Sequence, residues 1–244
     1  MPDFWKIVNQ VINSSDVILL VLDARLANES RNLEIEDKVR KSGKKFLYVI
    51  NKIDVLEAEQ QRKIRIKPSI FVSAKERTGT LKLLRKILML SKKEKVTVGI
   101  LGYPNTGKSS LINVLKGKSS APVSSVSGFT KGLQKVRIHS RIVLLDTPGV
   151  FPYKEKNETK HALIGAKDFN QIKDPEEVAL ELISELKGSV EEFYGVDTLK
   201  DSEQTLERIG IKKNYLGKKG KPDIIRTSKQ IIKDWQDGKI KQKY

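Results

Sequence analysis

The chain has no cysteine among its 244 residues and only two histidines, His139 and His161. The lack of cysteine excludes a disulfide framework, a thiolate zinc site and a cysteine nucleophile, and two histidines are too few for a histidine-based metal cluster. The longest apolar run covers only Val17 to Leu22, whereas a helix needs about 20 apolar residues to cross a bilayer. No basic segment followed by an apolar stretch opens the chain, so we predict no signal peptide. These absences predict a cytoplasmic protein that does not enter a membrane.

Positive charge, in contrast, is abundant. Lys and Arg number 47 against 30 Asp and Glu, for a formal net charge of +17. Residues 1–167 hold 32 basic and 15 acidic groups and so carry the whole surplus, while residues 168–244 hold 15 of each. Such a surplus favours a polyanionic partner, since phosphate backbones attract Lys and Arg through counterion release. A lysine-rich surface that serves solubility or heat tolerance is the alternative.

Five short apolar runs alternate with helical patterns, which is typical of a parallel α/β sheet. Each run is followed by a polar residue or a glycine. In open α/β sheets ligands bind beyond the carboxyl ends of the strands, so we expect these residues to line one site. The predicted strands are Val17–Leu22, Phe46–Ile50, Ile70–Val72, Val96–Leu101 and Ile142–Leu145.

The pattern changes in the last third of the chain. Residues 151–167 contain few large apolar groups and predict a mobile loop. Asp174-Pro175-Glu176-Glu177 then predicts a helix start, with Asp as N-cap, Pro at the first helical position and acids in the first turn. The apolar spacing from Ile224 to Trp235 predicts a second amphipathic helix. We therefore predict an α/β domain over 1–165 and a helical domain over 166–244.

The segment from Gly102 to Ser109 has the spacing G-x-x-x-x-G-K-S of a phosphate-binding loop. A predicted strand precedes it and a helical pattern, Ser110–Leu115, follows. The glycines let backbone N–H groups surround phosphates at a helix N-terminus. Lys108 supplies charge to the β- and γ-phosphates, which makes it a candidate catalytic residue, and Ser109 is a candidate Mg²⁺ ligand. The alternative is a glycine-rich turn that binds nothing. The nucleotide contacts expected from this segment are Asn105, Thr106, Gly107, Lys108, Ser109 and Ser110.

Asp146-Thr147-Pro148-Gly149 has the spacing D-x-x-G and follows the fifth predicted strand. Asp146 can hold the hydration shell of Mg²⁺, and the Gly149 N–H can meet a γ-phosphate, which makes Gly149 a second catalytic candidate. Thr130 lies in the Ser-rich segment between the two motifs and can reach Mg²⁺ only when a γ-phosphate is present. Thr130 is the third catalytic candidate, and it is also a candidate ligand of the nucleotide and of the metal. By themselves these residues also fit a plain turn and a loop threonine.

The earlier motif Asn51-Lys52-Ile53-Asp54 predicts recognition of a base. The Asp54 carboxylate can accept hydrogen bonds from both N1–H and the N2 amine of guanine, a pairing that adenine does not offer. Asn51 either binds the O6/N7 edge of the base or ties the motif to the phosphate loop, and the Lys52 stem can lie over the base plane. Ser73-Ala74-Lys75 would supply a backbone N–H to guanine O6. Guanine is therefore favoured over adenine, with a surface turn as the alternative.

These motifs are those of a GTPase in an unusual order, because the base-reading pieces precede the phosphate loop. The order resembles that of the circularly permuted GTPases of the YlqF/YawG type, which act in ribosome assembly. Val21-Leu22-Asp23-Ala24-Arg25, Asp174–Ala179 and Gly217–Asp223 are also similar to that family. The resemblance implies a P-loop GTPase fold with a doubly wound, mostly parallel, circularly permuted sheet and a small all-α C-terminal domain. It also implies GTP and GDP as ligands with Mg²⁺, and GTP hydrolysis coupled to maturation of the large ribosomal subunit, with rRNA contact.

Two features bear on hydrolysis. Val150 stands where many GTPases have the glutamine that orients the attacking water. Asn105 matches the asparagine that potassium-dependent GTPases use as a K⁺ ligand. The resemblance thus implies slow intrinsic turnover, faster in K⁺ and with ribosomal particles. Bacterial members carry a histidine before the first strand, and residues 1–16 have none. His161 is a possible substitute, although a solvated loop histidine is the commoner case.

The C-terminal segment offers further candidates for RNA binding, since basic residues interleaved with an aromatic one suit unpaired bases or backbone. A solvated face is the alternative. The acidic stretch 168–199 would instead face a protein partner, and we expect a monomer. The rival functions are an RNA-binding module whose GTP is structural, and a P-loop metabolic kinase, which the N-K-x-D motif disfavours. The basic candidates are Lys212, Lys213, Lys218, Lys219 and Lys221, with Tyr215 between them.

Overall fold

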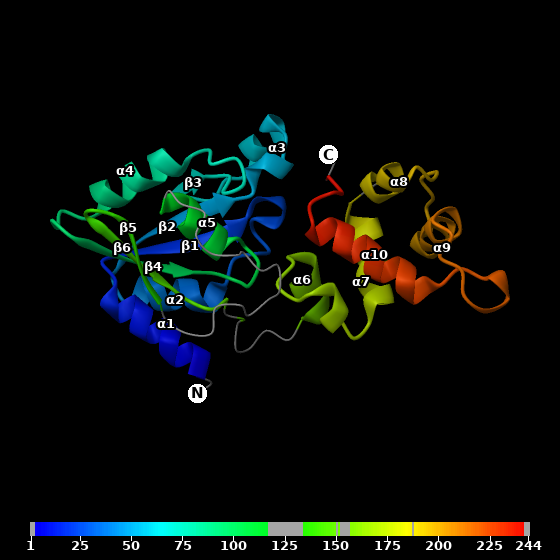
Figure 1. Cartoon of the computed structure of the whole chain (residues 1–244), viewed down its shortest axis with the longest axis horizontal. Helices are drawn as coiled ribbons and strands as arrows, with labels where there is room; N and C mark the ends of the chain where they lie inside the picture. Colours follow the sequence, from blue (N-terminus) through cyan, green and yellow to red (C-terminus); the bar gives the residue numbers. More distant parts are fainter. Residues whose placement is uncertain (1–2, 117–133, 150, 152–156, 187, 242–244) are drawn as a thin grey trace. The chain divides into compact units, whose positions relative to one another are not determined.

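A computed structural model describes residues 3–116, 134–149, 151, 157–186 and 188–241. The chain divides into two compact units, Met1–Lys156 and Asn157–Tyr244 (Figure 1). Among these described residues, the first unit contains one six-stranded sheet with helices, and the second is built from helices. Thr130 and Val150 lie outside the described residues.

The sheet of the first unit has the order β3-β2-β1-β4-β6-β5. All neighbouring pairs are parallel except β5 with β6. This confirms the predicted mostly parallel sheet, and the five predicted runs match β1, β2, β3, β4 and β6 to within one residue at each end. The strands are β1 (Val17–Asp23), β2 (Lys45–Asn51), β3 (Ser69–Phe71), β4 (Val96–Leu101), β5 (Gln134–His139) and β6 (Ile142–Asp146).

Strand β5 was not predicted. It lies at the edge of the sheet and pairs only with β6. Val136 and Ile138 pack partly against the core, while the other four residues of the strand are exposed. A strand with two half-buried residues and four polar ones carries little apolar signal, since edge strands are commonly polar.

Alternation along β1 explains how helices cover both faces of the sheet. Ile18, Leu20 and Leu22 belong to one apolar cluster with α1 and α2. Val17, Leu19 and Val21 belong to the other, with α4 and α5 (Figure 1). The helical elements of this unit are α1 (Asp3–Ser14), η1 (Ala24–Leu26), α2 (Leu33–Lys41), η2 (Ile53–Val55), α3 (Ala58–Lys63), α4 (Thr80–Leu90) and α5 (Lys108–Leu115).

The second unit packs its helices on α10. The Trp235 ring is fully buried and its Nε1–H donates to the Leu163 carbonyl at 2.6 Å. The helix start at Asp174 is as predicted, because its side chain accepts from the Glu177 N–H. The elements are α6 (Glu158–Leu163), η3 (Phe169–Gln171), α7 (Pro175–Glu185), α8 (Ser189–Tyr194), α9 (Ser202–Lys212), η4 (Lys218–Gly220) and α10 (Ile224–Gln236).

The prediction of a loop over 151–167 is wrong for its second half. Residues 158–163 form α6, which contacts α7 and α10. The predicted boundary at 165/166 consequently falls inside the second unit, because α6 packs with the helices that follow it. Among the residues that the structure describes, no helix is both long and apolar enough to span a bilayer.

Candidate nucleotide-binding site

The phosphate loop follows β4 directly and ends in the first turn of α5. Asn105 (φ +59°) and Gly107 (φ +91°) adopt left-handed backbone conformations, which turn the chain into the helix. Behind the loop the Lys108 ammonium is buried and donates to the carbonyls of Gly102 at 3.1 Å and Tyr103 at 2.6 Å. The loop is further closed by the Thr106 hydroxyl, which donates to the Tyr103 carbonyl at 3.0 Å.

Burial lowers the pKa of Lys108 to about 8, and the Asp146 carboxylate opposes this shift. The site therefore holds a cation in a place where desolvation disfavours it. A bound phosphate would reverse that effect, since an opposite charge within a few ångströms favours the charged form.

Asp146 ends β6, and its carboxylate is buried. Its Oδ1 atom has no hydrogen-bond partner among the described residues. Burial raises the pKa of Asp146, while Lys108 and the Thr147 backbone lower it. An unpartnered buried carboxylate oxygen requires an explanation. Ser109, in the first turn of α5, carries a second candidate oxygen ligand, and oxygen ligands are the kind that Mg²⁺ prefers.

Gly149 lies close to the phosphate loop. A Cβ atom added to it would stand 2.4 Å from both the Cα and the N of Pro104. The preceding segment is fixed to β4, because the Thr147 hydroxyl donates to the Ile100 carbonyl at 2.8 Å. Only a glycine permits this approach, so the D-x-x-G segment and the phosphate loop are neighbours, as the sequence predicted.

Asn51 connects the base-reading loop with the phosphate loop and with the segment Ser73-Ala74-Lys75. Its Nδ2 donates to the Thr106 carbonyl of the phosphate loop at 3.0 Å, and its Oδ1 accepts from the Ala74 N–H at 3.1 Å. Of the two roles considered for Asn51, the structure shows the tie to the phosphate loop. The fit is close, since a Cβ on Gly107 would come within 2.2 Å of the Asn51 Nδ2.

Asp54 is half-buried in η2, and its Oδ1 accepts a hydrogen bond of 2.5 Å from the Ser73 hydroxyl. Ser73 also receives the Glu76 N–H on its Oγ. The two segments that were predicted to recognise the base are thereby held together. The Ala74 N–H, in contrast, donates to the Asn51 side chain in this structure.

The structure adds one functional element that the motif analysis missed, an ion cluster under the base-reading loop. Asp23 is 1% exposed, lies beside Asn51 in the β1–β2 register and pairs with both Arg25 and Lys52 at 2.8 Å. Burial alone would raise the pKa of Asp23, but the two cations hold it below its ordinary value.

Lys52 has a left-handed backbone (φ +66°), which is uncommon for a residue with a side chain. Burial lowers the pKa of its ammonium, and Asp23 opposes that shift. The conformation and the ion pair together fix the Lys52 stem. In the sequence, the only sign of this ion cluster is Asp23-Ala24-Arg25 at the end of a strand, a segment that resembles the family.

The second unit holds the remaining candidates. His161 lies on α6 and is buried at 8% exposure, so the expectation of a solvated loop histidine is wrong. Lys212 donates to the Gly195 carbonyl, and the Lys213 ammonium lies 5.3 Å from the Tyr194 ring centroid. Tyr215 lies under the Arg226 guanidinium at 4.5 Å. Three further candidates are exposed at or next to η4, namely Lys218, Lys219 and Lys221.

The site thus defines a P-loop nucleotide-binding domain whose base-reading strands come first in the chain. A family model described as "50S ribosome-binding GTPase" matches residues 97–225. The chain therefore belongs to the 50S ribosome-binding GTPase family. The match begins at β4, and the base-reading motifs precede it, as a permuted order requires.

Relatives agree with this assignment. A GTP-binding protein of Methanocaldococcus jannaschii is 43% identical over 246 residues, which cover 96% of this chain and 65% of that protein. Nucleolar GTP-binding protein 2 of Saccharomyces cerevisiae is 32% identical over 251 residues, covering 97% of this chain. The chain spans only 52% of the length of that yeast relative.

Two solved structures share the fold. GDP-bound YlqF has a TM-score of 0.68 at 24% identity, with 96% of each chain covered. GNP-bound YlqF from T. maritima also has a TM-score of 0.68, at 23% identity, with 98% of this chain and 96% of that chain covered. The predicted circularly permuted GTPase fold of the YlqF type is confirmed.

Proposed function

We propose that the chain is a GTP-hydrolysing switch that acts in assembly of the large ribosomal subunit. The observation that carries the proposal is the double hydrogen bonding of Asn51 to Thr106 and Ala74. It joins the base-reading loop to the phosphate loop without a ligand, so one guanine nucleotide can engage both. Family membership and the nucleolar relatives supply the cellular context.

In the proposed complex Asp54 accepts hydrogen bonds from guanine, and the Lys52 stem lies along the base. Because the Ala74 N–H is used by Asn51, we assign the contact with guanine O6 to the Lys75 N–H. Lys108 and the backbone from Asn105 to Ser110 hold the phosphates, and the Gly149 N–H meets the γ-phosphate.

Mg²⁺ would be held by Ser109, Thr130 and Asp146, and when bound it neutralises charge on the β- and γ-phosphates. The protein's own share is to place Lys108 at those phosphates and to keep water out of the loop. Position 150 is a valine and carries no group to orient an attacking water. We therefore propose slow intrinsic hydrolysis that a ribosomal partner accelerates.

We further propose Asn105 as a K⁺ ligand, with faster hydrolysis in KCl than in NaCl at equal ionic strength. A monovalent cation there would offset charge between the β- and γ-phosphates, as an arginine finger does. Equal rates in the two salts would remove the cation from the mechanism.

The proposed partner is a precursor of the large ribosomal subunit, bound through its rRNA in a nucleotide-dependent way by a monomer of this chain. The exposed Lys218, Lys219 and Lys221 support RNA contact by the C-terminal unit. The chain would act where the particle is assembled. That place is the cytoplasm in a cell without a nucleus and the nucleolus in a eukaryote.

Two measurements test the proposal. Phosphate release from GTP is followed with and without purified large-subunit precursors, and co-sedimentation with those particles is compared in GDP and in a non-hydrolysable GTP analogue. We expect stimulated hydrolysis and tighter co-sedimentation with the analogue. Nucleotide binding without hydrolysis, even on particles, would instead establish an RNA-binding module with structural GTP.

A further inference from the structure

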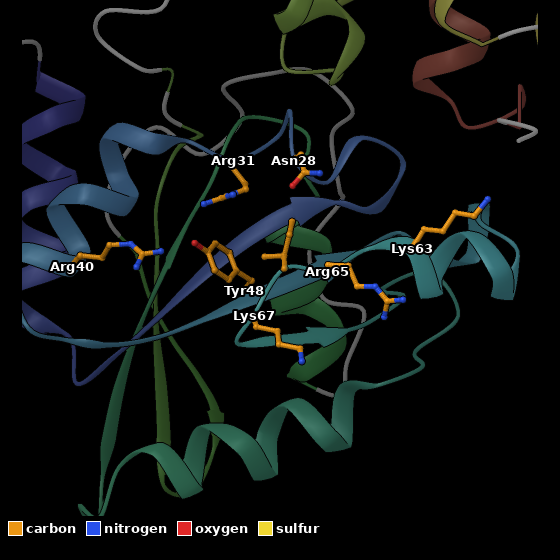
Figure 2. A pocket seen from close by; sticks show the side chains of 8 residues that line it. Asn28, Arg31, Arg40, Tyr48, Lys63, Arg65 and Lys67 are labelled. Atoms are coloured by element: carbon orange, nitrogen blue, oxygen red, sulfur yellow. The ribbon is translucent and has the colours of Figure 1, made fainter.

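A pocket of about 400 Å³ lies outside the nucleotide motifs, on the face of the sheet that α1 and α2 cover. Tyr48 of β2 contributes to its base, Arg31 and Arg40 come from the start and end of the α2 region, and the segment 63–67 forms the other side (Figure 2). None of its lining residues belongs to the motifs that were assigned to GTP.

The lining is strongly basic. It contains five cations, Arg31, Arg40, Lys63, Arg65 and Lys67, and no acidic residue. Arg31 is neutralised by Glu36 through hydrogen bonds of 2.6 and 2.8 Å, and Lys63 lies 3.6 Å from Glu59.

The other three cations carry the excess charge of the pocket. Arg65 and Lys67 are exposed and make no ion pair within the described part of the chain. The exposed Arg40 guanidinium lies 5.3 Å over the Phe46 ring, a contact that leaves its charge uncompensated. A pocket lined in this way is suited to a polyanion.

Tyr48 is the buried residue of the pocket. It is 1% exposed, and burial and the neighbouring Glu36 carboxylate raise the pKa of its hydroxyl, while Arg31 and Arg40 lower it. Figure 2 shows the hydroxyl pointing toward the guanidinium groups of Arg31 and Arg40. The hydroxyl therefore belongs to the group of Glu36, Arg31 and Arg40 beside it, and the exposed cations of the pocket are left to meet a ligand.

We propose that this pocket binds a phosphate of an RNA strand together with its attached nucleotide. Arg40, Arg65 and Lys67 supply the charge that holds the phosphate. The volume lies within the range of about 300–1,000 Å³ of small-molecule sites, so there is room for a whole nucleotide rather than a bare phosphate ion. The inference rests on the proposed function in one respect, namely that the chain binds RNA.

The test uses the full chain and a fluorescein-labelled oligouridylate of about 16 nucleotides. The pocket variant combines Arg40→Ala, Arg65→Ala and Lys67→Ala. A matched variant removes three charges from and beside α4, on the opposite face of the sheet, with Lys82→Ala, Arg85→Ala and Lys92→Ala. A fluorescent GTP analogue verifies that each variant still folds and binds nucleotide.

We expect the pocket variant to lose at least about tenfold in RNA affinity, with a salt slope smaller by about 2, because each single-strand phosphate contact contributes about 0.7. The α4 variant keeps the RNA affinity and the salt slope of the wild-type chain. Tyr48→Phe keeps all three cations and leaves RNA binding unchanged.

The remaining outcomes overturn the inference in distinguishable ways. If wild-type chain binds RNA and both triple variants lose affinity equally, binding is spread over the surface and the pocket is not the site. Competition by inorganic phosphate or by poly-glutamate as strong as that by unlabelled RNA would show a general anion site. Failure of the wild-type chain to bind RNA would remove the RNA part of the proposed function as well.

Discussion

The side-chain amide of Asn51 donates to the backbone carbonyl of Thr106 at 3.0 Å, across 55 positions of the chain. Asn51 ends the strand that leads into the base-reading loop, and Thr106 is in the phosphate loop. The two halves of the candidate site are therefore joined by one side chain whose two polar atoms are both used.

Asn51→Asp tests this bridge. The aspartate keeps an acceptor for the Ala74 N–H but turns a carboxylate oxygen toward the Thr106 carbonyl. We expect the free energy of unfolding to fall by about 1–3 kcal/mol, the usual cost of an unsatisfied buried group, and GTP affinity to fall at least about tenfold. Urea unfolding and fluorescence titration measure the two effects. The exposed Asn13→Asp serves as control, and equal behaviour of the two variants would contradict the role of Asn51.

Asp54→Asn tests base recognition. Guanine offers two donors to the carboxylate, whereas asparagine presents one acceptor and one donor. That pair matches xanthine, which has an N1–H next to a carbonyl. We expect GTP affinity to fall by about two orders of magnitude, for loss of a charge-assisted pair worth about 3 kcal/mol, and XTP affinity to rise. Competition assays with GTP, XTP and ATP measure both. Unchanged selectivity would show that the base lies elsewhere.

Lys108 predicts a pH dependence of nucleotide binding. Its pKa is about 8 in the unliganded protein, and bound phosphates raise it, so binding takes up a proton once the free lysine is neutral. GTP affinity is then at its maximum below pH 8 and falls above pH 8, by at most about tenfold per pH unit. Calorimetry at pH 9 in buffers of different ionisation enthalpy detects the uptake. Lys108→Met should bind weakly and without this dependence, and a flat wild-type profile would refute the assignment.

Gly149→Ala tests the contact between the D-x-x-G segment and the phosphate loop. The new Cβ would lie 2.4 Å from Pro104 backbone atoms, so the segment must withdraw from the γ-phosphate position. We expect hydrolysis on ribosomal particles to fall at least about tenfold, in line with loss of a hydrogen bond to developing charge, and GDP affinity to change little. Gly217→Ala is the matched control substitution, because the nearest atom to its new Cβ is 3.8 Å away. It should leave hydrolysis and GDP affinity unchanged.

Asp23→Asn tests the ion cluster below Lys52. The change leaves Arg25 and Lys52 without a counter-charge, and breaking a buried pair in this way costs about 3 kcal/mol or more. Asp37→Asn removes the exposed partner of Lys41 and should cost less than about 1 kcal/mol. Urea unfolding compares the variants. A loss at Asp23 no larger than at Asp37 would show that the cluster does not stabilise the loop.

Motifs that sit at the ends of buried strands could be predicted from the sequence. Apolar runs locate β1, β2, β4 and β6, and in a parallel sheet their carboxyl ends share one edge, so Asn51 and Asp146 had to lie near Gly102. The spacing of the motifs did not predict the hydrogen-bond partner of the Asn51 side chain. This partner lies 55 residues away in the chain, and no local sequence pattern indicates it.

Features that depend on packing between distant elements were missed. Helix α6 has little apolar signal of its own and is buried by α7 and α10. The basic pocket likewise gathers Arg40, Tyr48 and Arg65 from three separate segments. In each case the sequence contains the residues, but only the tertiary fold places them together.

The strand order has a consequence for synthesis. Strands β1, β2 and β3 leave the ribosome before β4. Strand β1 lies at one edge of these three strands, and this edge is covered only when β4 pairs with it. Domains fold from the N-terminus during translation, and an uncovered strand edge invites aggregation. A nascent chain of this protein thus exposes β1 until Val96–Leu101 has emerged, and no nucleotide can protect it, because the loop that would hold the phosphates has yet to be made.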